Sequence, residues 1–268
     1  MVPTCWWRAL GYLAPGHEKG RRLINTRSSQ VVAQLRQEIF DGTFPPASPL
    51  REVPLADRYG VSRRTLREAL LVLNEQGLVV HRHNTGAVVR SFDADDIEDL
   101  YKVRRMLECE GAKNAASADD ELLRGVERAF LSLEKAAEQG IGSVDLAQAD
   151  MAFHGAVIAL SASPRTDEFY ERVGSQMTYA ITLLQHREEA FAVPSTSLVA
   201  EHRAILDAVV NRDVYASQRL ILEHIATHEA TLTALVSSTS RQSRRGRTTS
   251  EAGSLAGDST GPAFLTTT

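Results

Sequence analysis

A group of aspartate and histidine residues in the second half of the chain has the spacing of metal ligands. Asp150 and His154 are one helical turn apart, so both side chains face the same side of a helix and can hold one metal ion. His202 and His224 flank a turn at 211–213, and both lie roughly 14–17 Å from it at a helical rise of ~1.5 Å per residue. An antiparallel pair of helices therefore places these two histidines at one level.

His154 lies at a similar distance from the next turn, at Ser163, so four potential ligands are expected to meet in one layer of a helical bundle. An aspartate with three histidines suits a divalent first-row ion. Zinc is the favoured ion, and nickel or another first-row ion fits the same ligand set. The remaining coordination positions would stay open, and an open position on a cation attracts a carboxylate. We assign His186 and His228 to structural or surface roles.

A second group with a chemical signature lies in the first third of the chain, in the segment GVSRRTLREALLVLNEQGLV (60–79). Basic and polar residues gather at the start of an expected helix, where a recognition helix reaches the edges of DNA bases. Arginine suits bidentate contact with guanine, and hydroxyl side chains suit phosphate or base contacts. We expect the three arginines to have no acidic partners three or four residues away. The candidate contacts are Ser62, Arg63, Arg64, Thr65 and Arg67.

A hairpin is predicted directly after this helix. The β-rich runs LVVHRH (78–83) and AVVRS (87–91) flank Asn84-Thr85-Gly86, which is a turn sequence. His83 and Gly86 lie at its tip. This tip is a candidate wing that contacts the minor groove or the DNA backbone.

The elements around this segment predict a winged helix-turn-helix of three helices and a hairpin. The first helix has Ser28 or Ser29 as its N-cap and ends before Gly42. The second spans about 52–59, and Gly60 closes it. The third spans about 63–76, where Ser62 caps its start and Gly77 ends it.

From Asp93 onward the sequence has no strand-like alternation, and six helical patterns predict an antiparallel bundle. These patterns span 94–116, 118–138, 143–162, 165–189, 196–211 and 213–236. The fold class is therefore mainly α. The predicted organisation is a mobile N-terminal extension at 1–26, the winged helix-turn-helix at 27–92, a helical domain at 93–236 and a disordered tail, rich in Ser, Thr and Gly, at 237–268.

Charge is divided unevenly among these segments. Residues 1–92 carry 13 Lys and Arg against 7 Asp and Glu, a balance of +6, whereas residues 93–236 carry 13 against 25, a balance of −12. The tail adds +2, which gives the net charge of −4 over 268 residues. A basic domain joined to an acidic one indicates two domains with different partners.

The overall composition excludes several classes of protein. Apolar residues make up 43% and charged residues 24% of the chain, which is typical of globular proteins and not of fibrous or disordered ones. Two cysteines, Cys5 and Cys109, cannot form a disulfide framework, and a reducing cytoplasm is expected. No stretch has the roughly 18–20 apolar residues that a membrane helix needs, so no membrane partner is expected.

Residues 31–90 resemble the GntR family of bacterial transcription regulators. The matching pieces are VVAQLRQEIFDG, PLRE at 49–52, GVSRRTLREAL, LNEQGLV at 73–79 and the wing glycine Gly86. The resemblance implies that a homodimer binds double-stranded DNA at a short inverted repeat. It also implies contacts from the candidate residues of the third helix and from the wing around His83 and Gly86. Val53 stands where some members carry an arginine that touches DNA, so that contact is expected to be missing.

Residues 93–236 resemble the helical ligand-binding domain of the FadR subfamily, which is called FCD. The matching pieces are DDIEDLYKVRRMLE (95–108), DMAFH (150–154), EHRAILDAVVNRD (201–213) and LEHI around His224. In the metal-binding branch of this domain an aspartate and three histidines coordinate a divalent ion, and these residues correspond here to Asp150, His154, His202 and His224.

Arg104 is the candidate effector-binding residue. Members of the family point an arginine of R-x-x-L-E into the pocket, and its fork fits a carboxylate. The alternative is a simple ion pair with Glu108, one turn further along the helix. The sequence as a whole predicts a DNA-binding transcription regulator, a repressor, controlled by a small organic acid bound at the metal. The alternatives are a metal-dependent hydrolase, a regulator whose metal is purely structural, and a regulator for which the metal itself is the signal.

Overall fold

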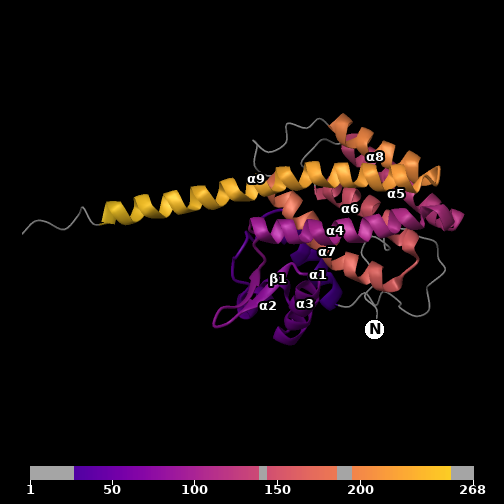
Figure 1. The fold of residues 1–268 in the computed structure, drawn as a ribbon. Helices are drawn as coiled ribbons and strands as arrows, with labels where there is room; N and C mark the ends of the chain where they lie inside the picture. The colour runs from indigo at the N-terminus through magenta and orange to yellow at the C-terminus, as the bar shows by residue number, and fades with distance from the viewer. Residues whose placement is uncertain (1–26, 139–143, 186–194, 255–268) are drawn as a thin grey trace, which may run out of the picture.

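The computed structural model describes residues 27–138, 144–185 and 195–254, and these form two parts that lie against each other (Figure 1). We call residues 27–92 the head and the described residues from 93 on the bundle. The predicted N-terminal extension at 1–26 lies outside the described residues. None of the described helices is both long and apolar enough to cross a membrane.

The head contains the three helices and the hairpin that the sequence predicts. One face of each helix is apolar at helical spacing, and these faces form a shared core around Leu35, Leu66 and Leu73, which are fully buried. The elements are α1 (Arg27–Phe40), α2 (Glu52–Tyr59), α3 (Arg63–Glu75), β1 (Val79–Arg82) and β2 (Gly86–Val89).

The ends of the head helices are set by local signals. Gly60 ends α2 with φ 62°, a left-handed conformation that glycine adopts without strain. Ser62 caps α3, because its Oγ accepts a hydrogen bond from the Thr65 backbone N–H at 3.1 Å. The prediction of an N-cap at Ser28 or Ser29 is wrong: α1 already includes both residues, since it begins at Arg27.

The hairpin pairs β1 with β2 in antiparallel register, with Val79 opposite Val89 and Arg82 opposite Gly86. Asn84 and Gly86 have positive φ values of 64° and 79°, as the predicted turn requires. Leu50 also donates its backbone N–H to the Ala87 carbonyl, so the segment before α2 is tied to the hairpin. This fixes the wing relative to α2 and α3.

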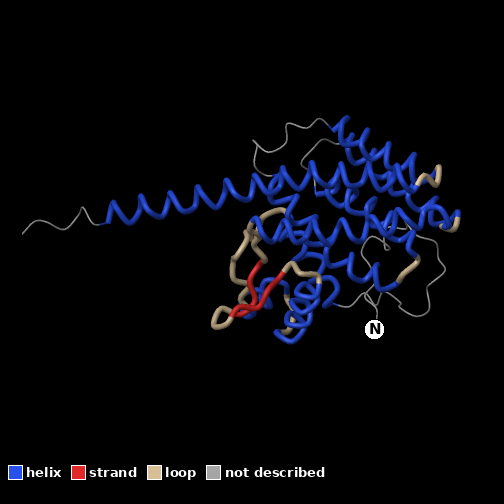
Figure 2. The backbone as a smooth tube through the Cα atoms, viewed as in Figure 1, coloured by secondary structure: helices blue, strands red, loops and turns tan. Residues whose placement is uncertain are grey.

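The bundle consists of antiparallel helices, as predicted, and the described residues form strands only in the hairpin of the head (Figure 2). Helices α4 and α9 lie side by side, and α6 is enclosed by α4, α5 and α7. The helices are α4 (Ala94–Asn114), α5 (Asp120–Glu138), α6 (Val144–Ile158), α7 (Pro164–Gln185), α8 (Ser195–Val210) and α9 (Val214–Ser254).

The largest difference from the sequence prediction concerns the tail. Helix α9 continues to Ser254, well past the boundary at 236 where we expected disorder to begin. Segment 237–254 has few large apolar residues but contains no proline, so nothing in the chain stops the helix from continuing. Residues 255–268 and His186 lie outside the described residues.

Helix α7 joins the bundle to the head. Tyr179 of α7 is fully buried in the core of the head, with its ring 6.1 Å from the ring of Phe40 and 5.8 Å from the ring of Phe92. Gln176, one turn earlier, lies against Gly77 at the end of α3. The two parts therefore share a packed junction, and the linker around Phe92 is part of it.

Candidate metal site and DNA-reading face

Three helices of the bundle bring the four predicted metal ligands together. Asp150 and His154 lie on α6, His202 on α8 and His224 on α9. One ligand atom of each residue lies within 4.8 Å of the ligand atoms of the other three, and all four residues are buried. We call these four residues the Asp150 cluster. The apolar positions that pack α6 between its neighbours also turn Asp150 and His154 toward α8 and α9.

Each histidine of the cluster has its Nδ1 atom against a hydrogen-bond acceptor. The Nδ1 atoms therefore carry the protons in the neutral rings, and the Nε2 lone pairs are left for another partner. The acceptors are Glu108 Oε2 for His154 at 2.7 Å, the Leu198 carbonyl oxygen for His202 at 2.8 Å and Glu201 Oε2 for His224 at 2.9 Å.

The Nε2 atoms of His154 and His202 lie so close together that a positive charge is needed between them. His154 Nε2 and His202 Nε2 are 3.2 Å apart, and Asp150 Oδ1 lies 2.8 Å from His202 Nε2. With both Nδ1 atoms protonated, these contacts join two lone pairs, and a lone pair with a carboxylate. Only a proton or a metal cation makes them favourable, and three imidazoles with one carboxylate are ligands that zinc and its first-row neighbours accept.

The electrostatic surroundings favour the protonation states that metal binding needs. Burial works against ionisation of Asp150, but the hydrogen bond with His202 and the charges of His154 and Arg104 hold the pKa of its carboxyl below the ordinary value. Burial, helped by Arg104, lowers the pKa of His154 to about 4. Burial also places the pKa of His224 well below its usual value. At neutral pH the cluster thus contains an anionic aspartate and, at His154 and His224, neutral imidazoles.

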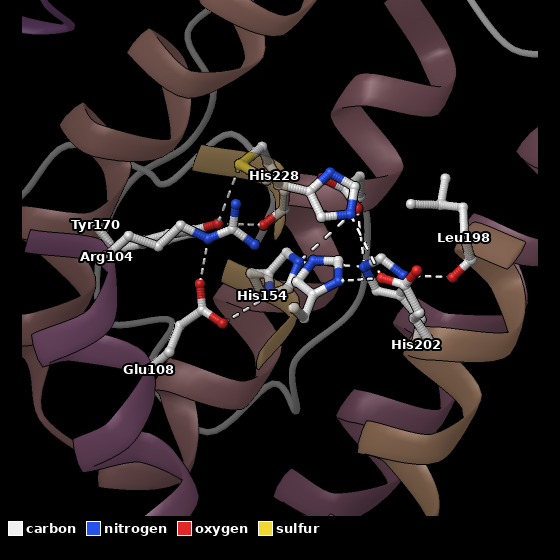
Figure 3. Close-up of polar contacts among 11 residues, drawn as sticks. Arg104, Glu108, His154, Tyr170, Leu198, His202 and His228 are labelled. Atoms are coloured by element: carbon white, nitrogen blue, oxygen red, sulfur yellow. Dashed lines mark hydrogen bonds and ion pairs between the residues drawn. The ribbon is translucent and has the colours of Figure 1, made fainter. Parts of the chain in front are cut away.

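Arg104 is connected to the cluster through Glu108 (Figure 3). Its Nε donates to Glu108 Oε1, and the other carboxylate oxygen of Glu108 contacts His154, with both Arg104 and Glu108 essentially fully buried. Although burial opposes both charges, Arg104 lowers the pKa of Glu108 and Glu108 raises that of Arg104. The ion pair named in the sequence analysis as the alternative role of Arg104 is therefore present.

Arg104 also lines a cavity, so the ion pair and a pocket role do not exclude each other. Its Nη2 atom is buried and has no hydrogen-bond partner among the described residues. The cavity has a volume of about 270 Å³ and lies beside the Asp150 cluster. It is lined by Tyr101, Arg104, Leu146, Ala147, Asp150, Ile181, Ser197, Leu198, Glu201, Thr227, His228, Thr231 and Leu232.

The structure adds two residues to this region that the sequence analysis did not select. Glu201 contacts His224, and its Oε2 atom lies 3.5 Å from His228 Nε2, so these three residues form a second ligand group next to the first. His228, which we assigned to a structural or surface role, lines the cavity. Its spacing of four from His224 is the same signal that paired Asp150 with His154, and it could have identified this residue.

On the head, the predicted DNA-reading residues share one exposed end of α3. Arg64 is the most open, with 89% of its side chain exposed, and Arg63 and Arg67 are also exposed. Ser62 and Thr65 are engaged with each other, since their hydroxyl oxygens are 2.9 Å apart. Figure 1 shows α3 and the hairpin on the side of the molecule away from α9.

The expectation that these arginines have no acidic partner three or four residues away is wrong for Arg64, and Arg63 and Arg67 meet an acid that is more distant in the sequence. Arg64 Nε donates to Glu68 Oε1 at 3.1 Å across one helical turn. Both carboxylate oxygens of Glu52 on α2 lie 2.8 Å from Arg67 Nε and share its one N–H. Glu52 Oε2 also lies 3.6 Å from Arg63 Nη2. All of these pairs are exposed and hence weak, so a phosphate can replace the acid at little cost. His83 and Gly86 lie at the exposed tip of the hairpin, and Val53 is exposed on α2.

Two family models match the chain, and they divide it as the structure does. The model described as bacterial regulatory proteins of the gntR family matches residues 27–89, and the model described as the FCD domain matches residues 99–227. The first covers the head, including α3 and the hairpin. The second covers all four ligands of the Asp150 cluster.

Known proteins are similar over most of this chain. A solved GntR transcriptional regulator from Rhodococcus sp. RHA1 is 30% identical with a TM-score of 0.64, over 78% of this chain and 98% of that one. An HTH-type transcriptional regulator of Bacillus subtilis is 29% identical, over 73% of this chain and 86% of its own. A probable D-xylose utilization operon transcriptional repressor of Paenarthrobacter nicotinovorans is 25% identical, over 78% and 90%.

Proposed function

The chain belongs to the GntR family of DNA-binding transcription regulators and carries an FCD domain, and from this premise we propose that it is a repressor released by a small carboxylate. The carboxylate binds beside a divalent cation held by Asp150, His154, His202 and His224. The observation that carries the proposal is the convergence of these ligands on a cavity that Arg104 also lines. Because the relatives are regulators, a metal-dependent hydrolase is not the function of the site.

The four ligands fit zinc best, and nickel or another first-row ion suits the same atoms. A bound cation supplies positive charge and open coordination positions for the carboxylate of an effector. The residues around the cation site have separate roles. Glu108 and Glu201 hold the Nδ1 protons of His154 and His224, which keeps the Nε2 atoms directed at the cation.

Arg104 would bind the carboxylate of the effector. Its Nη2 atom is buried and has no partner among residues 27–138, 144–185 and 195–254, and an unsatisfied buried donor costs about 1–3 kcal/mol. A carboxylate in the cavity removes this cost and gains a charge-assisted hydrogen bond. Glu108 stays paired with Nε and keeps the guanidinium in place.

The head would bind DNA through Ser62, Arg63, Arg64, Thr65 and Arg67 of the α3 end, and through His83 and Gly86 of the wing. Two copies of the chain, as a homodimer, would place two such heads on an inverted repeat of double-stranded DNA. Support comes from the exposed arginines and from the basic balance of the first 92 residues. The repressor named among the relatives supports the direction of control.

The effector would act on DNA binding through the junction between bundle and head. Ile181 lines the cavity, and Tyr179, two residues earlier on the same helix, is buried in the core of the head. A ligand shifts the equilibrium only by its difference in affinity for two states. A tenfold change in operator affinity requires about 1.4 kcal/mol of such coupling.

Replacing one ligand tests the proposal. Asp150→Asn should lower the bound zinc per chain, measured by elemental analysis after dialysis, and should abolish the rise in melting temperature that an acid gives in a panel of hexanoate, hexanedioate, gluconate and lactate. Asp145→Asn, at an exposed aspartate on the same helix, is the matched control and should behave as the parent does. Circular dichroism establishes that both variants are folded.

The outcomes separate the remaining alternatives. A purely structural metal predicts that Asp150→Asn melts earlier while no acid stabilises the parent protein. A direct metal sensor predicts that zinc alone changes DNA binding and that the acids have no effect. If Asp150→Asn retains both its zinc and its response to acid, the proposed site is wrong.

A further inference from the structure

The cavity beside the proposed metal ligands is lined by both polar and aliphatic side chains. Arg104, Tyr101 and Asp150 bring polar groups to it from α4 and α6. Aliphatic side chains from α6, α7, α8 and α9 form the other walls, and no described lining residue besides Arg104 is a lysine or an arginine. These aliphatic residues are Leu146, Ala147, Ile181, Leu198 and Leu232.

Two buried donors of the cavity lack an acceptor within the described ranges of the chain. The Arg104 Nη2 atom and the Tyr101 hydroxyl are both buried without a hydrogen-bond partner among the described residues, and both residues are at most 1% exposed. A carboxylate has two oxygens that accept hydrogen bonds, so one group can satisfy both donors. The Nε atom of Arg104 already donates a hydrogen bond to Glu108.

The hydroxyl groups along the rest of the cavity are poor partners for a ligand with many hydroxyls. Thr227 donates to the Glu223 carbonyl oxygen at 3.1 Å, and Thr231 donates to the Thr227 carbonyl oxygen at 3.0 Å. Their protons are thus used within α9. Ser197 Oγ is 3.5 Å from Glu201 Oε1, so it faces an acid. A sugar acid would bury hydroxyls here without enough partners.

Glu201 makes the cavity unfavourable for a second carboxylate. Its Oε2 atom accepts from His224 Nδ1 and lies 3.5 Å from His228 Nε2, so the two histidines nearest to it already face this acid. With a divalent cation at Asp150, the positive charges of the cation and Arg104 only balance the negative charges of Asp150, Glu108 and Glu201, so the first bound carboxylate already makes the site negative. Like charges in a site of low dielectric repel strongly.

We infer that this cavity takes a small monocarboxylate with an apolar body, and that Glu201 excludes dicarboxylates. The inference rests on the proposed function, because it gives the chemical class of the effector at the same site. The carboxylate lies at Arg104 and Tyr101, beside the cation of the Asp150 cluster, and the hydrocarbon body lies against the aliphatic side chains. A cavity of about 270 Å³ limits the body to a small one, since drug-sized ligands occupy roughly 300–1,000 Å³.

Calorimetric titration of the zinc-loaded full chain tests the inference with three acids of equal carbon number: hexanoate, hexanedioate and gluconate. Hexanoate should bind at least about tenfold more tightly than the other two. In the series from propanoate to hexanoate, affinity should rise by about fourfold per methylene, which corresponds to about 0.8 kcal/mol. Such a slope arises only if the body of the ligand is buried against apolar groups.

Two variants assign the selectivity to residues. Glu201→Gln keeps an oxygen that can accept from His224 Nδ1 but removes the charge, so the gap between hexanoate and hexanedioate should fall to about threefold or less. Glu223→Gln, at an exposed acid on α9, is the matched control and should keep the gap. Ile181→Thr should flatten the rise with chain length. Zinc content is measured for each protein, so that loss of metal is not mistaken for a change in selectivity.

The results distinguish this inference from the proposed function. If hexanedioate or gluconate binds the zinc-loaded protein at least as tightly as hexanoate, the inference is wrong while a carboxylate effector at the metal still stands. A Glu201→Gln variant that binds zinc and keeps the full gap also overturns the role of Glu201. If none of the acids binds, both the inference and the proposed function are wrong.

Discussion

The roles of Arg104 and of the histidines in the Asp150 cluster depend on which group each side-chain nitrogen contacts. The four proposed metal ligands could be selected from the sequence, because their spacing on helices places them at one level. Glu201 could not be selected in this way. It is next to His202 in the sequence, but its role becomes apparent only because the fold places it against the Nδ1 atom of His224. Arg104 donates from Nε to Glu108, while its Nη2 atom has no acceptor in the part of the chain that the structure describes and is left for the proposed effector.

Removing Arg104 should show how strongly the buried ion pair is coupled. Arg104→Met leaves the Glu108 carboxylate buried without its cation, which should cost about 3–5 kcal/mol in the free energy of unfolding. The double variant Arg104→Met with Glu108→Leu should recover a large part of that loss, because no charge is then left unpaired. Urea denaturation measures both values. Equal stability of the single and double variants would contradict the coupling.

Arg64 provides the test of the DNA-reading face. It is the most exposed of the three arginines, and its exposed ion pair with Glu68 is weak. Arg64→Ala should weaken binding to a selected operator by about 1–3 kcal/mol if it contacts a base, and the preference at one base position should relax. Lys102→Ala, at an exposed lysine of α4, serves as the control. Unchanged operator affinity for Arg64→Ala would remove Arg64 from the interface.

Among the elements, the helices of the bundle and the hairpin were predictable because Gly, Pro and Asn separate them along the chain. What the sequence did not predict is how closely two helices approach. At Gly111 of α4, a Cβ atom would lie 2.3 Å from the Val157 carbonyl oxygen of α6. This contact brings α4, with Glu108, close enough to α6 for the carboxylate to reach His154.

Gly111→Ala should therefore force α4 and α6 apart. The expected loss is about 3 kcal/mol in the free energy of unfolding, at the upper end of the cost of overpacking. Gly174→Ala is the contrast within the same bundle, because its Cβ atom would meet only the Tyr170 ring, at 3.3 Å, and alanine favours the helix. That variant should stay within about 1 kcal/mol of the parent. Equal losses for the two variants would show that the α4–α6 approach is not tight.

In the whole molecule, the division of charge corresponds to the division of the fold. The basic first third carries the end of α3 that we propose to read DNA, and the acidic remainder forms the bundle that contains the Asp150 cluster. This division could be predicted from the sequence because the charge balance changes from basic to acidic at the boundary. The sequence did not predict the junction, since Tyr179 reaches the core of the head from a helix that begins more than seventy residues after that boundary. Nor did it give the length of α9, because composition reports on packing rather than on whether a helix continues.

The most direct test of the central claim is the operator dissociation constant of the full, zinc-loaded chain with and without saturating hexanoate, measured by fluorescence anisotropy on a duplex that the protein selects from random DNA. Hexanoate should weaken operator binding by about tenfold or more, which is about 1.4 kcal/mol of coupling. After zinc is removed by a chelator, the acid should no longer change the constant. An operator dissociation constant that is the same with and without hexanoate, and with every other acid of the panel, would contradict the account.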